Sequence, residues 1–162
     1  MQIRPVRRED SQAVAEIYRY YVEESSFTFE EVPPTTEEMA ERIQAISKDF
    51  PYYVACNDHG QVLAYAYAHA FHERSAYRFS AEISIYSQVN KSEKGLGTAL
   101  YQTVERDLKT QGIKTILALV TADNQVSINF HKKNGYQIVG HLHQVGYKFD
   151  QWLDTVYLEK HI

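Results

Sequence analysis

The chain has 162 residues, enough for one domain with a sizeable core, and its 44% hydrophobic and 23% charged residues are typical of a globular protein. Its formal net charge of −4 argues against nucleic acid as the main partner, because binding phosphates requires a basic surface. The sequence has no apolar run of the roughly 18 residues that a membrane span requires, so we expect no membrane partner.

The N-terminus and the cysteine content bear on where the protein works. The first residues carry charges with no apolar stretch behind them, so a signal peptide is not expected. Cys56 is the single cysteine, which excludes an internal disulfide and suits a reducing compartment. Because Cys56 falls in an apolar run, we expect its side chain to be buried. These features predict a cytoplasmic protein.

The first third of the chain predicts one strand and two helices. A short strand is expected over residues 2–6, and Asp10 or Ser11 can cap a helix whose apolar residues recur at helical spacing. A second helix is expected over residues 35–48, because a Thr and a Glu three positions apart at its start form a capping-box pattern.

The rest of the chain alternates between strands and two further helices. Alternating or β-branched apolar stretches predict strands over residues 52–56, 61–71, 78–87, 113–120, 136–143 and 155–158. A polar loop is expected over residues 72–77. Helices are expected from Gly95 and Gly97 to near residue 112, and over residues 124–133. This order predicts a mixed α/β fold in one domain, residues 1–162.

The strongest local signal is a strand followed by a glycine turn and a helix start. Residues 82–87 lead into residues 93–98, which read EKGLGT. The first N–H groups and the positive dipole end of a helix favour an anion at such a turn. The turn lacks the third glycine of a dinucleotide-binding turn and the Gly-Lys-Ser/Thr of a P-loop, which disfavours nicotinamide and ATP. By itself, the pattern also fits a plain turn at a helix start.

Longer motifs add a family resemblance. The turn, followed by residues 124–136 with the pattern N-x-x-S-x-x-F-H-x-x-x-G-Y, resembles the GNAT acetyltransferase superfamily. Residues 50–52 (FPY), 74–77 (RSAY) and 144–154 (QVGYKFDQWLD), together with Glu82, resemble its phosphinothricin and methionine sulfone or sulfoximine N-acetyltransferase branch. The resemblance runs from about residue 3 to residue 157. It implies a mostly antiparallel twisted sheet flanked by helices on both faces.

The resemblance also implies acetyl-CoA as co-substrate. The residues implied to hold its pyrophosphate on their backbone amides are Glu93, Lys94, Gly95, Leu96, Gly97 and Thr98. The residues implied to contact the rest of the cofactor are Ile85, Tyr86 and Ser87, which would pair with its pantetheine arm, and Asn124. One position departs from the pattern, because Ser92 stands where the superfamily usually has Gln or Arg. We expect this change to tune cofactor binding and not to abolish it.

Two residues are predicted to act in catalysis. Acetylation of an amine needs a base, because an ammonium is not a nucleophile until it loses a proton. Glu82, on a central strand three residues before the cofactor segment, is the predicted base; the alternative is a structural carboxylate paired with Arg74 or Arg78. His131 occupies a position where many relatives carry a tyrosine thought to protonate the CoA thiolate. Its alternative is a structural helical histidine.

The acceptor is expected to be a small amine that carries a carboxylate. Arg74, Ser75 and Tyr77 lie on the loop before the Glu82 strand and are predicted to bind it, because arginine binds carboxylates in a fork geometry. A solvated loop arginine is the alternative. No histidine spacing such as H-x-x-x-H is present, so no metal is expected. The resembling branch is commonly dimeric, which implies a homodimer.

Two other functions stay open on the sequence. The same fold can acetylate a polyamine, an aminoglycoside or a protein N-terminus, and a change in the loop of residues 72–77 could redirect specificity. A non-catalytic acyl-CoA sensor is the alternative from another class. The presence of both Glu82 and His131 disfavours the sensor.

Overall fold

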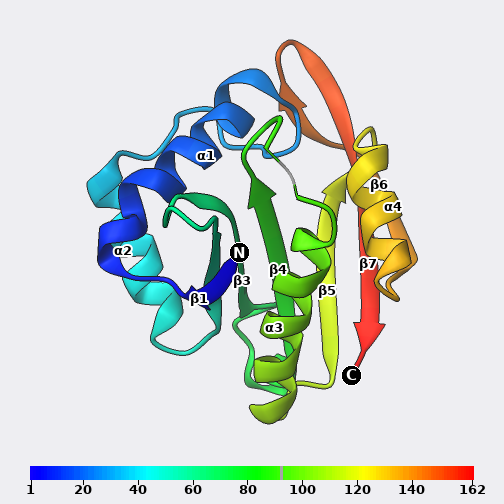
Figure 1. Cartoon of the computed structure of the whole chain (residues 1–162). Coiled ribbons are helices and arrows are strands. Elements are labelled where there is room, and N and C mark those ends of the chain that lie inside the picture. Colours follow the sequence, from blue (N-terminus) through cyan, green and yellow to red (C-terminus); the bar gives the residue numbers. More distant parts are fainter. Residues whose placement is uncertain (92) are drawn as a thin grey trace.

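The computed structural model describes residues 1–91 and 93–162, which form one seven-stranded sheet and four α-helices (Figure 1). The strands are β1 Gln2–Pro5, β2 Tyr52–Cys56, β3 Val62–Ala70, β4 Ser80–Ser87, β5 Thr115–Thr121, β6 Gln137–Lys148 and β7 Gln151–His161. The α-helices are α1 Ser11–Glu24, α2 Thr36–Ser47, α3 Leu96–Thr110 and α4 Gln125–Lys133. Ser92, the departure from the superfamily pattern, lies outside the described residues.

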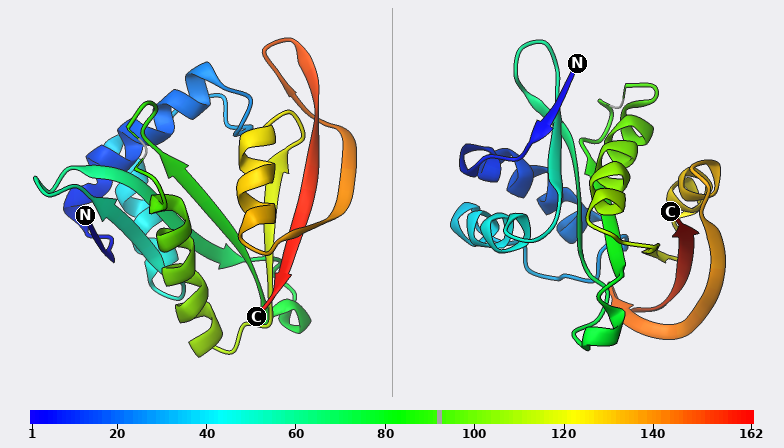
Figure 2. Two further views of the ribbon diagram at one scale, coloured as in Figure 1. Left: turned by 45° about the vertical axis from the view of Figure 1, so that its right-hand side comes forward. Right: turned by 90° about the horizontal axis from the view of Figure 1, so that it is seen from below.

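The sheet has the strand order β1-β2-β3-β4-β5-β7-β6. Neighbouring strands are antiparallel except for β4 and β5, which are parallel. Helices α1 and α2 cover one face of the sheet, and α3 and α4 lie on the other (Figure 2). The predicted mixed, mostly antiparallel sheet with helices on both faces is therefore confirmed.

Two hydrophobic clusters, one on each face, attach the helices to the sheet. Leu100, Val104 and Leu108 of α3 recur at helical spacing and are fully buried in the cluster that includes β3, β4 and β5 residues. On the other face, residues of α1 and α2 pack on β2 and β3 in a cluster that contains Val54 and Cys56. The prediction that Cys56 is buried is confirmed.

Local signals set two of the helix starts. The Thr35 hydroxyl caps α2 by accepting a 3.1 Å hydrogen bond from the Glu38 N–H, as the sequence pattern predicts. Gly95 caps α3 with φ 83°, in the left-handed region that a residue with a side chain rarely adopts. The glycine turn therefore leads directly into the helix, as predicted.

The last two strands are longer than predicted. The sequence predicts strands over residues 136–143 and 155–158, whereas β6 and β7 form a long hairpin that turns at Phe149 and Asp150. The register shifts between Leu142 and Gly146. This irregularity interrupts the alternation of apolar and polar side chains, which is why the predicted strands are shorter than β6 and β7. The loop of residues 72–77 contains a short 3-10 turn, Ser75–Tyr77.

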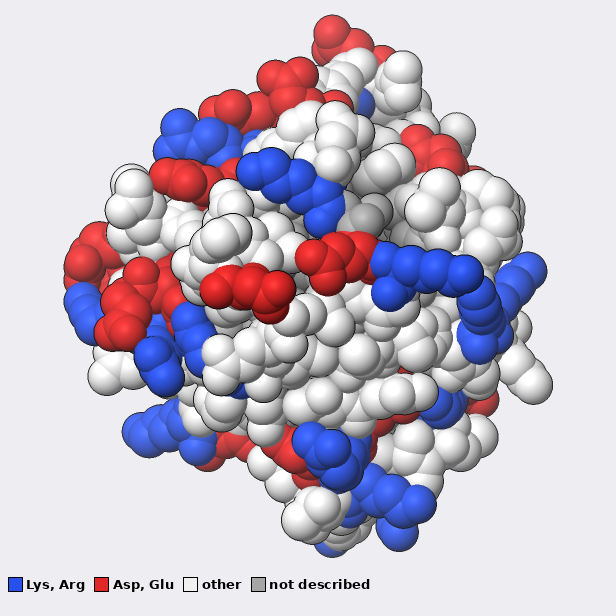
Figure 3. All heavy atoms as spheres, in the orientation of Figure 1, with Lys and Arg blue, Asp and Glu red and all other residues white. Residues whose placement is uncertain are grey.

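None of the helices in the described part of the chain has the length and apolar character of a membrane span. On the face shown in Figure 3, basic and acidic side chains are interspersed. This distribution agrees with the small net charge of −4.

Candidate active site

The parallel strands β4 and β5 separate at Glu82. Their pairing joins residues 80–82 to residues 115–117 and ends at the pair Glu82 and Leu117. Beyond this point the two strands diverge toward their C-terminal ends (Figure 2). A cavity of about 790 Å³ lies between them and is also lined by α3 and α4. The last residues of β4 therefore present backbone edges to a ligand instead of to β5.

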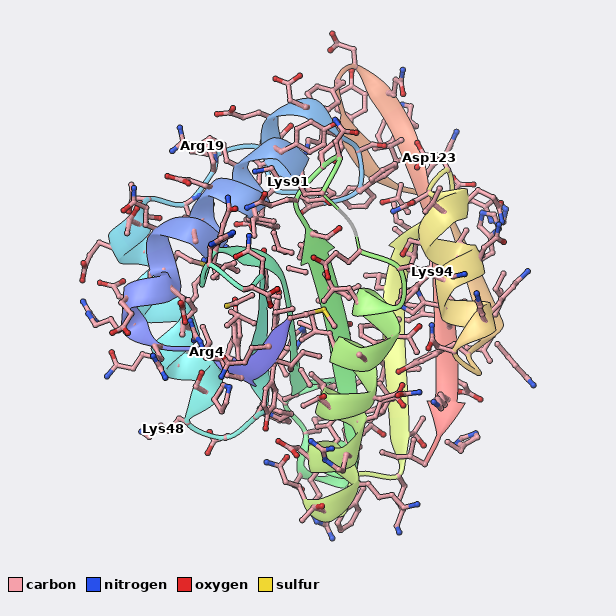
Figure 4. The ribbon with its side chains drawn as sticks, viewed as in Figure 1. Arg4, Arg19, Lys48, Lys91, Lys94 and Asp123 are labelled. Atoms are coloured by element: carbon pink, nitrogen blue, oxygen red, sulfur yellow. The ribbon has the colours of Figure 1, made fainter. Side chains whose placement is uncertain are left out.

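The cavity brings together the predicted cofactor-binding residues. All ten line it: Ile85, Tyr86, Ser87, Glu93, Lys94, Gly95, Leu96, Gly97, Thr98 and Asn124. They come from the end of β4, the start of α3 and the start of α4. Figure 4 shows the Lys94 side chain extending from the start of α3 toward α4. A cation is thus available beside the turn where an anionic group is expected.

The glycine turn has the geometry of an anion site. The Leu96 N–H donates to the Glu93 carbonyl over 3.1 Å, while the next amides, Gly97 and Thr98, belong to the first helical turn and have no acceptor within the helix. A Cβ atom at Gly97 would lie 3.0 Å from a ring carbon of Phe130. Glycine is therefore required for the close approach of α3 to α4, and the amides stay accessible from the cavity.

The contact predicted between the end of β4 and the pantetheine arm of the cofactor involves the backbone of β4 more than its side chains. The ring of Tyr86 packs edge-on against Tyr18 and Tyr21, on the α1–α2 face of the sheet. The Tyr21 hydroxyl donates a 2.6 Å hydrogen bond to the Ser87 carbonyl, which fixes the end of β4. Tyr86 is therefore positioned to contribute its backbone to the cavity.

Glu82 forms an ion pair with His69 on the neighbouring strand. The Nε2 atom of His69 lies 3.0 Å from Oε2 of Glu82. The Nδ1 atom of His69 lies 2.9 Å from the Ala70 carbonyl, which can only accept, so Nδ1 carries a proton. The hydrogen bond to Glu82 raises the pKa of His69. Among the described ion pairs, Glu82 is joined to His69, and not to Arg74 or Arg78 as the structural alternative supposed.

His131 is buried and hydrogen-bonded at both ring nitrogens. Its Nδ1 donates to the Ser127 carbonyl over 2.7 Å, so its Nε2 accepts a 2.7 Å hydrogen bond from the Tyr101 hydroxyl. Burial lowers the pKa of His131, which favours this neutral form. Both rings line the cavity. Tyr101 was not among the predicted site residues, although it lies one helical turn after Gly97 and that spacing places it on the same side of α3.

The predicted acceptor-binding residues lie outside the cavity. The cavity wall formed by the described residues does not include Arg74, Ser75 or Tyr77. Their loop is linked to the sheet through Phe71, whose ring lies 5.7 Å from that of Tyr77 and 6.2 Å from that of Tyr157. The loop therefore lies beside β7 and not at the glycine turn.

A buried lysine fixes the loop that follows α1. The Nζ atom of Lys148 donates to the carbonyls of Ser25 and Thr28, both over 2.8 Å, and lies 3.4 Å from that of Tyr21. Burial lowers the pKa of Lys148. Because Phe27 of this loop lines the cavity, Lys148 connects the far end of β6 to the cavity wall.

Comparison with known proteins identifies the family. Residues 3–157 match the family model described as an acetyltransferase (GNAT) domain. The chain is a GNAT acetyltransferase. A phosphinothricin N-acetyltransferase of Alcaligenes faecalis is 36% identical to this acetyltransferase, over 98% of the chain and 81% of the relative. A methionine sulfoximine/methionine sulfone acetyltransferase of Pseudomonas aeruginosa is 33% identical, over 68% of the chain and 64% of the relative.

A solved structure extends the comparison to the fold of the acetyltransferase. A phosphinothricin acetyltransferase from Sinorhizobium meliloti, solved in complex with AcCoA, superposes with a TM-score of 0.95. It is 34% identical, and the match covers 99% of this chain and 88% of that chain. The resemblance inferred from the motifs is thereby confirmed.

Proposed function

We propose that this acetyltransferase transfers an acetyl group from acetyl-CoA to the amino group of a small amino-acid analogue of the phosphinothricin, methionine sulfone or methionine sulfoximine type. The observation that carries the proposal is the separation of β4 from β5 directly after Glu82. It gives the Glu82 carboxylate a position on β4 directly before Ile83, where the strand begins to line a cavity that fits an extended cofactor. The names of the relatives support the choice of acceptor.

The cavity fits the cofactor in charge and in shape. The free amides at the start of α3 suit a pyrophosphate, and the glycine at position 97 allows α3 to lie close to Phe130 of α4 at the cavity wall. The unpaired edge of β4 from Ile85 to Ser87 suits an amide-containing arm, which would pair as an additional strand. When bound, acetyl-CoA supplies an activated acetyl thioester near the point where β4 and β5 separate.

Glu82 is the base in this proposal. Its carboxylate accepts a proton from the ammonium of the acceptor, directly or through a water, and leaves an amine that can attack the acetyl carbonyl. The new C–N bond forms as the C–S bond breaks; the nitrogen loses its second proton to give the amide, and the sulfur leaves as a thiolate that takes up one proton. The ion pair with His69 holds the Glu82 side chain in place on β4 between turnovers.

Tyr101 and His131 are proposed to act at the leaving group. Because the observed hydrogen bonds occupy both nitrogens of His131, its supported role is to position the Tyr101 hydroxyl at the cavity wall. For His131 itself to protonate the CoA thiolate, its hydrogen bond to Tyr101 would have to break. This direct role of His131 stays a prediction. Replacing Tyr101 with Phe keeps the ring and tests whether the hydroxyl contributes.

The loop after β3 is proposed to bind the acceptor. Arg74 supplies a guanidinium for the acceptor carboxylate, and Ser75 and Tyr77 supply hydroxyl groups. The loop packs near Tyr157 through the ring of Phe71. The pKa of Tyr157 is raised by burial and by the nearby charge of Glu82. This proximity supports an acceptor that extends from Glu82 toward the loop.

We further propose that the protein is cytoplasmic and forms a homodimer. The hairpin of β6 and β7 exposes several large apolar side chains, among them Val145, Tyr147, Phe149 and Trp152. Large exposed apolar side chains gathered on one hairpin are typical of an interface. A molar mass of two chains by light scattering is the expected result, and a mass of one chain at working concentration would contradict the dimer.

A screen for CoA release tests the function. Wild-type protein with acetyl-CoA is offered methionine sulfone, methionine sulfoximine, phosphinothricin, common amino acids, spermidine, an aminoglycoside and an alanine-terminated peptide. The proposal expects turnover with the first three. Preferred turnover with spermidine, the aminoglycoside or the peptide would overturn the acceptor class and leave the family intact. Tight binding of acetyl-CoA in calorimetry with no turnover of any amine would favour the acyl-CoA sensor.

A further inference from the structure

We propose that His141, His143 and Asp154 form a binding site for one zinc-class divalent ion, which joins β6 to β7 away from the active site. The three side chains offer ligand atoms that all lie within 4.8 Å of one another. None of them belongs to the described residues that line the acetyltransferase cavity. The proposal therefore does not depend on the proposed function.

The rings of His141 and His143 are stacked. They are parallel to within 5°, with centroids 4.3 Å apart. The Nε2 atom of His141 lies 2.8 Å from Oδ2 of Asp154. With all ligand atoms of the three residues within 4.8 Å of one another, a change of side-chain rotamers suffices for coordination of one small divalent ion.

The sheet brings the three residues together. Successive side chains of a strand point to opposite faces, so His141 and His143, two positions apart, lie on one face of β6. His141 pairs with Val156 of β7, and Asp154 lies two residues before Val156 on the same face. The register shift after Leu142 then places the irregular part of β6 opposite Asp154.

Backbone geometry orients the carboxylate. The Gln144 N–H donates a 2.8 Å hydrogen bond to Oδ1 of Asp154, and this hydrogen bond lowers the pKa of that carboxyl. Gln144 itself has φ 53°, in the left-handed region, so the backbone of the bulge turns this N–H toward Asp154. One carboxylate oxygen is thus held by the backbone while the other faces the histidines. Hydrogen bonds of this kind orient metal ligands.

The chemistry of the ligands selects the ion. Two imidazoles and one carboxylate are ligands for zinc and its neighbours Co²⁺, Ni²⁺ and Cu²⁺, whereas Mg²⁺ and Ca²⁺ require oxygen ligands. Three protein ligands leave at least one position for water. No metal was expected from the sequence, because no histidine spacing such as H-x-x-x-H is present. The H-x-H spacing becomes a ligand pair only on a strand, and its third member comes from another strand.

Zinc binding to the untagged full-length protein is measured by isothermal titration calorimetry, with Co²⁺ absorption spectra as a second readout. We expect one ion per chain in the wild type. His143→Ala is the first variant, and Asp154→Asn is the second because it retains an oxygen that can accept the Gln144 N–H. Each should weaken zinc binding more than about tenfold, the lower bound for losing even an outer partner of a metal site. His59→Ala, at an exposed turn histidine, is the matched control and should bind as the wild type does.

The outcomes separate the proposal from its alternatives. Loss of zinc binding in both variants, with unchanged thermal midpoints in the absence of metal, supports the site. Wild-type affinity in either variant places the ion elsewhere and overturns it. Absence of binding at millimolar zinc, or binding of Mg²⁺ and Zn²⁺ with equal affinity, also overturns it. Acetyltransferase activity is not a readout, so a failure here leaves the proposed function untouched.

Discussion

His69 and Glu82 form an ion pair across two neighbouring strands, with Nε2 of the histidine 3.0 Å from Oε2 of the glutamate. The antiparallel register of β3 and β4 sets the two residues directly opposite one another. Cross-strand pairs of opposite charge stabilise a sheet, and this pair lies at the point where β4 separates from β5. The same contact therefore bears on both stability and catalysis.

The ion pair predicts a pH dependence of stability. The folded protein raises the pKa of His69, so the contribution of the pair is fully present below the unfolded value of about 6.5. It is lost as the pH rises through the raised pKa of the folded state. The free energy of unfolding of His69→Gln should therefore fall below that of the wild type at pH 6 and approach it at pH 9. Urea unfolding measures this, with His59→Gln as control; a constant difference across the range would contradict it.

Glu82→Gln should lower kcat by about 10- to 1,000-fold, the scale of general acid–base assistance. The amide keeps the size of the carboxylate but cannot accept the proton of the ammonium. The dissociation constant of acetyl-CoA should change little, because the cavity is lined by other residues. Steady-state rates at saturating acetyl-CoA from pH 6 to 9 measure the effect. Wild-type turnover over this range would remove Glu82 as the base.

Gly97→Asp should weaken acetyl-CoA binding. The new carboxylate would lie at the helix start and repel the pyrophosphate, and two lost hydrogen bonds to a charged group, at about 1.5 kcal/mol each, correspond to about 100-fold. Calorimetry with acetyl-CoA measures the dissociation constant. Gly97→Ala is the control for packing, because its Cβ would press on Phe130 without adding charge. Equal effects of the two variants would attribute the loss to packing and not to the anion site.

Arg74→Lys should raise the KM for an acceptor that carries a carboxylate by about tenfold or more, because lysine retains the charge but loses the bidentate fork. The KM for acetyl-CoA should not change. The comparison is methionine sulfone against a simple amine of similar length, both at saturating acetyl-CoA. An equal rise for both acceptors would exclude this role for Arg74.

Lys148→Met should destabilise the protein by about 1–3 kcal/mol, because partly buried carbonyls after α1 lose their charged donor. The loop that carries Phe27 should loosen, and acetyl-CoA binding should weaken with it. Urea unfolding and calorimetry measure the two effects. Lys114→Met, at an exposed lysine, is the matched control. A Lys148 variant that is as stable as this control would show that the three carbonyls do not depend on the ammonium.

Local features of the chain could be predicted from the sequence. The Thr35 cap, the glycine turn at residues 95–97 and the spacing of α3 were correct, because each depends on residues within one or two helical turns. The motifs that follow the turn also led to the right family, since the family model matches residues 3–157. The sequence by itself thus determined the family, the helix starts and ten of the residues that line the cavity.

The tertiary structure decided which distant residues meet. His69 faces Glu82 because of the register of β3 and β4, and Tyr101 contacts His131 because α3 and α4 pack on the same face. His141 approaches Asp154 because β6 bulges against β7. Strand register depends on pairing between segments far apart in the chain, and a shift of one residue would turn each side chain to the opposite face. No local sequence pattern specifies the register of the paired strands, so these contacts could be identified only in the folded sheet.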